Sequence, residues 1–195
     1  MSLDRQSLTP AYFEALYADD ADPWRFATSD YEHRKYVATL GALNGHEIHA
    51  AFEVGCSIGI FSRQLARRCH SLLAVDVAER PLEQARRNCK GSNQVRIERM
   101  QIPREWPAEK FDLIVFSEVL YYLSPHDIRR AAARSLASSS PGGLILLVHW
   151  TGQTDYPCQG DEAVEHYMAA CEAELTPLLR RQEPEYRLDL LERKS

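Results

Sequence analysis

The fold is decided by the stretch Phe52-Glu53-Val54-Gly55-Cys56-Ser57-Ile58-Gly59. Its apolar residues predict a buried strand that ends in a glycine turn, with a helix to follow. Glycine permits a tight turn and lets a ligand approach the backbone closely. A turn of this kind, at the carboxyl end of a buried strand, is where an open α/β sheet binds its ligands. The stretch therefore predicts both the first strand of such a sheet and the place of a small-molecule site.

Outward from this stretch, short apolar runs alternate with polar segments that are long enough for a helix. This alternation is typical of a parallel sheet whose strands are joined by helices, and the continuous apolar runs indicate strands buried on both faces. After residue 173 the chain ends in two strand-like pieces. The last piece follows Pro184 too closely for a helical crossover, so we expect an antiparallel strand reached through a hairpin. The expected strands are residues 50–54, 71–76, 95–100, 111–117, 144–150 and 186–193.

Helix start and stop signals lie before and between these strands. Thr9-Pro10 predicts a helix over residues 11–17, because a capping hydroxyl and a first-turn proline both favour a helix start. Ser29 and Glu32 have the spacing of a capping box, which predicts reciprocal hydrogen bonds at the start of a helix over residues 30–43. The other expected helices run from Pro81 to Gly91, from Pro125 to before the Pro141-Gly142-Gly143 turn, and over residues 161–173.

Length, composition and charge narrow the class of protein. With 195 residues the chain is expected to form a single domain, residues 1–195, with a helical N-terminal segment 1–48 and a sheet core 49–195. No apolar run approaches the length that crosses a bilayer, so we expect no membrane partner. The net charge of −5 argues against a nucleic acid partner. Because the N-terminus lacks a signal-peptide pattern, the expected location is the cytoplasm.

The cysteines and histidines do not have the spacing of metal ligands. The five cysteines include no C-x-x-C pair, which argues against both a zinc cluster and a disulfide framework. The histidines likewise show no metal-ligand spacing with carboxylates or cysteines. We therefore expect no metal and a reducing compartment.

Two acidic residues and one serine indicate which ligand the glycine turn holds. Glu53 lies inside the first strand, where a carboxylate is costly to bury unless a cationic or hydrogen-bonding group meets it. Asp76 ends the second strand, where a carboxylate can accept hydrogen bonds from both hydroxyls of a ribose. Ser57 stands where dinucleotide enzymes place the glycine that gives a pyrophosphate room. These residues favour a ligand with an ammonium group and a ribose, and an NAD-dependent oxidoreductase is the disfavoured alternative.

Three further motifs follow the glycine turn, namely Ala74-Val75-Asp76-Val77, Phe111-Asp112-Leu113-Ile114-Val115 and Ser117-Glu118-Val119-Leu120-Tyr121-Tyr122-Leu123. Together with the turn, this succession resembles the class I S-adenosylmethionine-dependent methyltransferases over about residues 50–150. Two upstream motifs, Asp22-Pro23-Trp24 and Ser29-Asp30-Tyr31-Glu32, make it similar in particular to the nodulation protein S family.

The resemblance implies a fold, a cofactor and an acceptor class. The fold is an α/β, Rossmann-like sheet with strand order 3-2-1-4-5-7-6 and a lid built from the N-terminal helices. Members of the nodulation protein S family N-methylate a deacetylated chitooligosaccharide, using S-adenosylmethionine and releasing S-adenosylhomocysteine. We therefore expect a small polar acceptor, with an amino sugar or a deacetylated oligosaccharide as the first expectation. O-methylation of a small metabolite and a non-catalytic binding module that keeps the donor fold are the alternatives.

The resemblance also implies where the donor binds. After the third strand the family usually offers an aspartate to the adenine amino group, and here Gln101 takes that place. Its side-chain oxygen could accept the same hydrogen bond without a charge. The implied donor-binding residues are Trp24, Tyr31, Glu53, Gly55, Cys56, Ser57, Gly59, Asp76, Val77, Gln101, Ile102, Glu118 and Val119.

The acceptor is expected near the carboxyl ends of the fourth and fifth strands. Methyl transfer from a sulfonium is an in-line displacement, so the protein mainly aligns the reactants and excludes water. The connection over residues 151–160 is long for a loop without a function. The catalytic candidates are Glu118, Tyr122 and His149, and the residues expected to bind the acceptor are Trp150, Asp155 and Tyr156.

Overall fold

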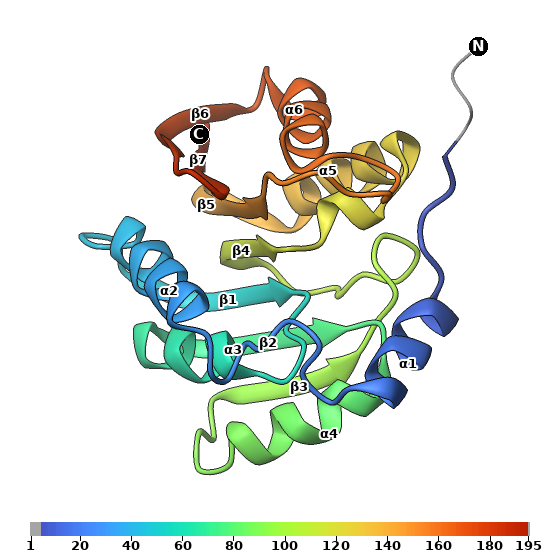
Figure 1. The fold of residues 1–195 in the computed structure, drawn as a ribbon. Helices are drawn as coiled ribbons and strands as arrows, with labels where there is room; N and C mark the ends of the chain where they lie inside the picture. Colours follow the sequence, from blue (N-terminus) through green and yellow to red (C-terminus); the bar gives the residue numbers. More distant parts are fainter. Residues whose placement is uncertain (1–4, 195) are drawn as a thin grey trace. The chain divides into compact units, whose positions relative to one another are not determined.

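The predicted sheet is present in the computed structural model, which describes residues 5–194 (Figure 1). Its strands are β1 (Ile48–Val54), β2 (Cys69–Asp76), β3 (Val95–Arg99), β4 (Phe111–Ser117), β5 (Ser139–Trp150), β6 (Leu175–Gln182) and β7 (Tyr186–Arg193). Within residues 5–194 the sheet has seven strands in the order β3-β2-β1-β4-β5-β7-β6, and β7 is antiparallel to β5 and β6. Both the strand order and the antiparallel strand are as predicted. The ends of the predicted 1–195 domain, residues 1–4 and Ser195, lie outside the described residues.

Helices precede the first strand and connect most of the others. The α-helices are α1 (Pro10–Asp19), α2 (Asp30–Ala42), α3 (Ile60–Leu65), α4 (Glu79–Asn88), α5 (Pro125–Ser138) and α6 (Gly160–Cys171). Two short 3₁₀ turns, η1 (Ala66–Arg68) and η2 (Leu120–Tyr122), follow α3 and β4. The alternation of strand and helix read from the sequence is therefore confirmed between β1 and β5, except where β3 connects to β4.

One of two compact parts of the chain comprises Thr9–Gln101. In this part β1 pairs with β2, and β2 with β3, in parallel ladders. The register places Val54 opposite Val75, so β1 and β2 end at the same edge of the sheet. Helix α1 packs beside α4 (Figure 1). The residues that follow Val54 and Val75 are therefore neighbours at the carboxyl ends of β1 and β2.

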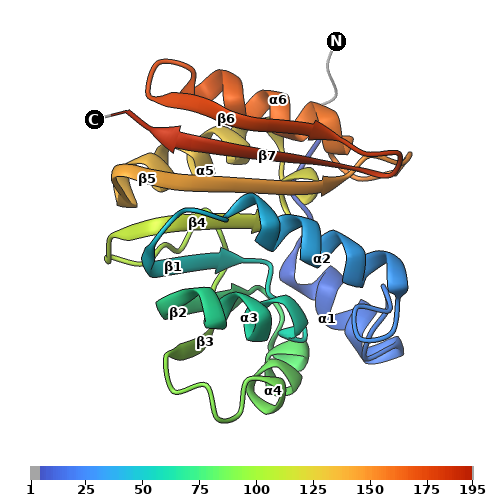
Figure 2. The same ribbon diagram turned by 90° about the vertical axis from the view of Figure 1, so that its left-hand side faces the viewer.

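The other compact part comprises residues 5–8 and 102–194. Here β4 pairs with β5 in parallel, and β5, β7 and β6 lie side by side, with α5 and α6 on one face (Figure 2). Phe116 of β4 and Tyr167 of α6 meet edge to face, with ring centroids 5.3 Å apart, and both side chains are fully buried. Two-sided burial of β4 and β5 explains their continuous apolar sequences.

The predicted helix caps are confirmed, with one difference. The hydroxyls of Thr9, Ser29 and Ser124 each accept a hydrogen bond from a backbone N–H in the first turn of α1, α2 and α5. The capping box predicted at Ser29 is only half formed, because the Glu32 carboxylate instead accepts from Lys35 Nζ at 3.0 Å. The Lys35 side chain is 2% exposed, and a buried ammonium group needs an acceptor.

Two predicted boundaries are wrong. The turn expected at Pro141-Gly142-Gly143 lies inside β5, which begins at Ser139 directly after α5. The β4–β5 register jumps there from Phe111↔Ser139 to Leu113↔Leu144, so the proline and glycines occupy a bulge that needs no regular ladder partner. Helix α4 begins at Glu79, two residues before Pro81, which is tolerated because first-turn N–H groups have no partner within the helix.

No helix within the described range is both long enough and apolar enough to cross a bilayer. All five cysteines are buried free thiols.

Candidate functional site

The glycine turn after β1 is held in a compact conformation by its own backbone. The N–H groups of Gly55 and Cys56 both donate to the Val75 carbonyl, at 2.9 and 3.0 Å. Gly55, Ser57 and Gly59 have positive φ angles of 86°, 48° and 77°. A positive φ is unfavourable for a residue with a Cβ atom, so the conformation of Ser57 must be stabilised by other contacts.

Asp76, at the end of β2, supplies one of these contacts. Its Oδ2 accepts a hydrogen bond from the Ser57 N–H at 3.0 Å, and its Oδ1 accepts from the Ala78 N–H at 3.1 Å. Burial raises the pKa of Asp76, and these backbone donors oppose the rise. A carboxylate has about four lone-pair sites, so each oxygen can accept a second hydrogen bond. Asp76 therefore both shapes the turn and remains able to receive a ligand hydroxyl.

Tyr17 of α1 supplies the other contact, and sequence reasoning missed it. Its hydroxyl lies 2.6 Å from the Ser57 hydroxyl, and both side chains are buried. Burial is the main cause that raises the pKa of Tyr17, which keeps the phenol protonated and able to donate. Forty residues separate Tyr17 from Ser57 in the chain, so no local motif announces the pair. The N-terminal helix is thus fastened directly to the turn.

Gly59 is the N-cap of α3 and stands where no side chain would fit. A Cβ atom at this position would lie 2.9 Å from both Cα and Cβ of Ala85 in α4. The Ile58 carbonyl next to it accepts a hydrogen bond from Asn88 Nδ2 at 2.7 Å. Helix α4 therefore packs tightly against the turn at Gly59.

Glu53 is a buried carboxylate on β1, as predicted. Its side chain is 1% exposed, and within residues 5–194 its Oε2 atom has no hydrogen-bond partner. Burial raises the pKa of Glu53 from 4.5 to about 7; the nearby Ser62 hydroxyl lowers it and Asp76 raises it further. A carboxylate in this state would gain substantially from an incoming cation.

The aromatic residues expected in the lid lie in the same part of the chain. Trp24 is half-buried and packs edge to face on Tyr17, with ring centroids 5.7 Å apart. Tyr31, at the start of α2, is half-buried with Lys35 Nζ 5.0 Å from its ring centroid. Trp24 is therefore linked through Tyr17 to the turn, and Tyr31 contacts Lys35 of the same helix.

The remaining donor-site candidates of this part follow β1, β2 and β3. Cys56 is buried inside the turn, and burial raises the pKa of its thiol, so the thiol is protonated. Val77 and Gln101 are half-buried, after the ends of β2 and β3. The Met100 N–H donates to the Asp76 carbonyl at 2.9 Å, which sets the start of the Gln101 segment against the end of β2. Val77 and Gln101 thus follow neighbouring strand ends.

A second group of candidates lies in the part formed by residues 5–8 and 102–194. Glu118 follows β4 with a φ of 55°, and its Oε2 accepts hydrogen bonds from the Tyr121 hydroxyl and the Trp150 N–H, each at 2.8 Å. Glu118 thereby joins the ends of β4 and β5. Val119 is half-buried, whereas Ile102 is 8% exposed.

His149 is fully buried in β5, and its Nε2 accepts a hydrogen bond from the Leu120 N–H at 3.1 Å. Its ring lies edge to face with Tyr121 at 5.6 Å. These contacts indicate that His149 positions the η2 segment, because its Nε2 atom already accepts the hydrogen bond from the Leu120 N–H. They assign no proton transfer to His149.

Tyr156 contacts the two neighbouring tyrosines that follow β4, Tyr121 and Tyr122. Its ring stacks on Tyr121 with centroids 5.6 Å apart and meets Tyr122 edge to face at 4.7 Å. Tyr121 and Tyr122 are both buried, so neither is exposed in preference to the other. Trp150 is half-buried at the end of β5.

The loop that carries Asp155 and Tyr156 is closed by Gln159. The Gln159 amide accepts from the Thr154 N–H at 3.1 Å and donates to the Thr154 carbonyl at 2.7 Å. A cavity of about 350 Å³ lies against this loop. The polar and aromatic residues that line it include Arg5, Gln6, Thr154, Asp155, Tyr156 and Gln159. Arg5 and Gln6 were not predicted, because nothing in their local sequence indicates that they meet a loop 150 residues away.

The arrangement of the glycine turn, Asp76 and Glu118 is consistent with the protein family that the sequence matches. The model of the nodulation protein S family matches residues 14–146, more than half of the chain. The chain belongs to the nodulation protein S family. The matched region includes the glycine turn, Asp76 and Glu118.

Individual relatives of the nodulation protein S family agree with this assignment. Nodulation protein S of Bradyrhizobium diazoefficiens is 37% identical over 118 residues, which cover 60% of this chain and 56% of that protein. The chain thus spans little more than half of the length of that relative. A crystal structure from Pseudomonas syringae, assigned to the methyltransferases, is 35% identical and has a TM-score of 0.73, covering 84% of this chain and 99% of that one.

The fold also matches a solved structure that contains a donor product. The N-methyltransferase NodS of Bradyrhizobium japonicum WM9, in complex with S-adenosylhomocysteine, has a TM-score of 0.81 at 22% identity. The match covers 96% of this chain and all of that structure. The class I methyltransferase fold predicted from the sequence is therefore confirmed for this nodulation protein S family member.

Proposed function

We propose that the chain is an S-adenosylmethionine-dependent methyltransferase that N-methylates an amino sugar or a deacetylated oligosaccharide. The observation that carries the proposal is Glu53, a buried carboxylate with a raised pKa and an Oε2 atom without a hydrogen-bond partner among residues 5–194. The methionine part of the donor carries an ammonium group, which such a carboxylate would pair with. NAD offers no ammonium group, which disfavours the oxidoreductase alternative.

The residues of the turn fit the rest of the donor. Gly55 has a φ of 86° and carries no side chain, so the donor could approach the backbone closely at this point of the turn. Asp76 would accept hydrogen bonds from the ribose hydroxyls, and Gln101 would accept one from the adenine amino group. The other residues proposed to line the donor are Trp24, Tyr31, Cys56, Ser57, Val77, Ile102, Glu118 and Val119.

The chemistry requires alignment more than proton transfer. When bound, the donor supplies a methyl group that is activated by its attachment to a sulfonium. Aromatic rings such as Trp24 and Tyr31 would attract that cation by about 0.5–2 kcal/mol. The protein would hold the acceptor amine in line with the methyl group and keep water out.

Glu118 and His149 would serve as positioning residues. Each already holds backbone near the ends of β4 and β5, through the Trp150 N–H and the Leu120 N–H respectively. Burial keeps the pKa of Tyr121 well above its usual value, so the Tyr121 hydroxyl stays protonated and donates to Glu118. Neither Glu118 nor His149 is needed as a base if the acceptor amine binds in its neutral form.

The acceptor would bind at the cavity beside the loop that Gln159 closes. The cavity's volume of about 350 Å³ is within the range of small-molecule sites. The Tyr156 ring could pack on the apolar face of a sugar, while Asp155 and Gln6 could bind its hydroxyls. Tyr122 would support the Tyr156 ring, and Trp150 would border the same site.

A methyl-transfer assay tests the activity. We expect S-adenosylhomocysteine to form with amino sugars or deacetylated oligosaccharides, and not with hydroxylated metabolites that lack an amine. Turnover of the hydroxylated metabolites alone would replace the proposal with an O-methyltransferase. Donor binding without turnover of any acceptor would favour the non-catalytic module, and NAD binding without S-adenosylmethionine binding would refute the proposal altogether.

The acceptor cavity is tested separately by Asp155→Ala and Tyr156→Ala. Each should raise the KM for the acceptor and leave the Kd of S-adenosylmethionine unchanged, because both residues lie outside the donor turn. Glu83→Ala, an exposed carboxylate on α4, is the matched control and should change neither value. Unaltered acceptor kinetics in both cavity variants would place the acceptor elsewhere.

A further inference from the structure

Two histidines face each other where β1 and β2 begin. The ladder aligns Ile48 with Cys69 and Ala50 with Ser71, so His49 lies opposite His70 on the neighbouring strand. Ile48 and Cys69 are buried, whereas His49 and His70 are exposed. Because side chains alternate between the faces of a strand, the two imidazoles project from the same face.

The two rings are arranged as ligands of one cation would be. Their Nδ1 atoms are 3.4 Å apart, and the rings are 4.9 Å apart at 76° to each other. Zinc binds imidazole nitrogen at about 2.0–2.1 Å, and a tetrahedral angle between two such bonds separates the nitrogens by about 3.3–3.4 Å. The observed separation therefore equals that of two imidazoles on one tetrahedral ion.

Glu47 adds a carboxylate to this pair. It lies two residues before His49, and its Oε1 is 3.8 Å from His49 Nε2. One ligand atom of each of Glu47, His49 and His70 lies within 4.8 Å of the other two. The Glu47 side chain is 78% exposed, so its rotation towards the histidines is not opposed by packing. Two imidazoles and a carboxylate form a ligand set that occurs in zinc sites.

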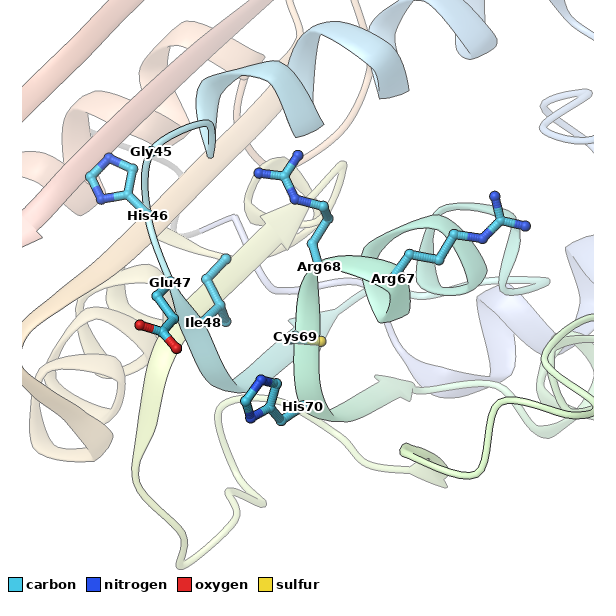
Figure 3. A pocket seen from close by; sticks show the side chains of 8 residues that line it. All are labelled: Gly45, His46, Glu47, Ile48, Arg67, Arg68, Cys69 and His70. Carbon is cyan, nitrogen blue, oxygen red and sulfur yellow. The ribbon is translucent and has the colours of Figure 1, made fainter.

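The surroundings leave room for water to complete the coordination. A cavity of about 480 Å³ lies against the same strand starts, with Glu47 and His70 among its lining residues (Figure 3). Arg68, which also lines it, donates hydrogen bonds to the Asn44 side chain and the Leu43 carbonyl at 3.1 Å each. These acceptors hold the Arg68 charge at the end of α2.

We propose that Glu47, His49 and His70 bind a divalent transition-metal ion of the zinc type. Six residues separate His49 from Gly55, and a strand rises by about 3.3 Å per residue, so the ion would lie about 20 Å from the donor turn. At this distance the ion takes no part in methyl transfer. Its effect is to clip the starts of β1 and β2 together, and the expected absence of a metal would be wrong for this edge of the sheet.

A second cluster of ligand-type residues, Cys158, Glu162 and His166, is less suited to a metal. The Cys158 side chain is buried and its Sγ contacts the Leu123 carbonyl at 3.7 Å. The thiol is thus enclosed by the protein and already engaged with a backbone carbonyl, whereas His49 and His70 are open to solvent. This cluster therefore serves as an internal control for the first.

The test is a titration of the full chain, without a polyhistidine tag, with Zn²⁺ in a calorimeter. We expect one ion per chain, and a melting temperature raised by about 5–10 °C when Zn²⁺ is at 100 times its Kd. His49→Ala and His70→Ala should each weaken binding by at least about 10–100-fold, since losing even a supporting residue of a metal site has that effect. His166→Ala should bind Zn²⁺ as the unchanged chain does.

The outcomes separate the proposal from its competitors. Because His49 and His70 are exposed, their variants should keep the circular dichroism spectrum of the parent. A visible spectrum of the Co²⁺-loaded protein that is lost in both variants supports the site. Absence of Zn²⁺ binding, equal binding in the His49→Ala and His70→Ala variants, or loss of binding in His166→Ala would overturn it.

Discussion

Replacing Glu53 with glutamine should make the ligand-free protein more stable. Glutamine has nearly the same shape as glutamate but cannot ionise. In the folded chain, burial raises the pKa of Glu53 from 4.5 to about 7. A carboxyl group whose pKa is higher in the folded than in the unfolded state favours folding while it is protonated, and this benefit is lost as it ionises. The wild-type chain should therefore lose stability between pH 4.5 and pH 7, whereas the variant lacks this contribution.

The size of the difference follows from the pKa values. A rise from 4.5 to about 7 corresponds to about 3 kcal/mol, at about 1.4 kcal/mol for each pH unit. The free energies of unfolding of Glu53→Gln and the wild type should be similar at pH 4.5 and differ by up to about 3 kcal/mol above pH 7. For a chain of this length the melting temperature should rise by about 6–12 °C at pH 8.

Urea unfolding at a series of pH values measures this difference directly. Glu83→Gln, at an exposed position, is the control and should follow the wild type throughout. The reasoning would be refuted if Glu53→Gln and the wild type had the same free energy of unfolding at pH 8. It would also be refuted if their difference were already complete at pH 4.5.

The same substitution should weaken donor binding while it stabilises the fold. A hydrogen bond to a charged group contributes about 1.5–3 kcal/mol, so the Kd for S-adenosylmethionine should rise roughly 10- to 150-fold. The wild-type affinity should also increase by up to about 10-fold from pH 6 to pH 8, because only the ionised carboxylate pairs with the ammonium group. Glu53→Gln should lack this increase, and calorimetry with the donor would detect it.

Two further substitutions test how the turn is held. Gly59→Ala should lower the free energy of unfolding by about 2–4 kcal/mol, because the new Cβ atom would meet Ala85 and the φ of this residue is positive. Gly91→Ala is the control: its φ is also positive but the space around it is open, so it should lower the free energy of unfolding by only about 1–2 kcal/mol. Urea unfolding measures both values. Tyr17→Phe removes the hydrogen bond to the Ser57 hydroxyl and should lower the free energy of unfolding by about 1 kcal/mol. Tyr12→Phe, on the exposed face of α1, should leave the free energy of unfolding almost unchanged. Equal losses in the two variants would contradict a stabilising role of the Tyr17–Ser57 hydrogen bond.

The sheet could be predicted because its sequence signals are local. Each buried strand is a continuous apolar run, and Thr9, Ser29 and Ser124 mark helix starts by their own side chains. The start of β5 could not be predicted in this way. Pro141 and the two glycines that follow indicate a turn, but the bulge that accommodates them depends on a shift in the pairing with β4. The partner of the Glu32 carboxylate could not be predicted for a similar reason, because the burial of Lys35 decides which group this carboxylate binds.

The residues of the candidate site also differ in whether the local sequence or distant contacts reveal them. Glu53 could be singled out because a carboxylate in a buried strand is unusual, and Asp76 because it ends the next strand. Tyr17 and Arg5 could not, since their roles depend on contacts with residues far along the chain. The burial of His149 and its bond to the Leu120 N–H likewise follow from the packing of β5 and η2, which no spacing in the sequence reveals.

The two hydrogen bonds that Asp76 accepts limit which mutations this position could survive. Both of its oxygens face backbone donors, so asparagine would turn an NH₂ group towards either the Ser57 or the Ala78 N–H. Alanine would leave both donors unsatisfied, and glutamate would be one methylene too long. A change in ligand preference would therefore have to begin elsewhere in the turn, because a single substitution at Asp76 would damage the fold of the turn before it could select a new ligand.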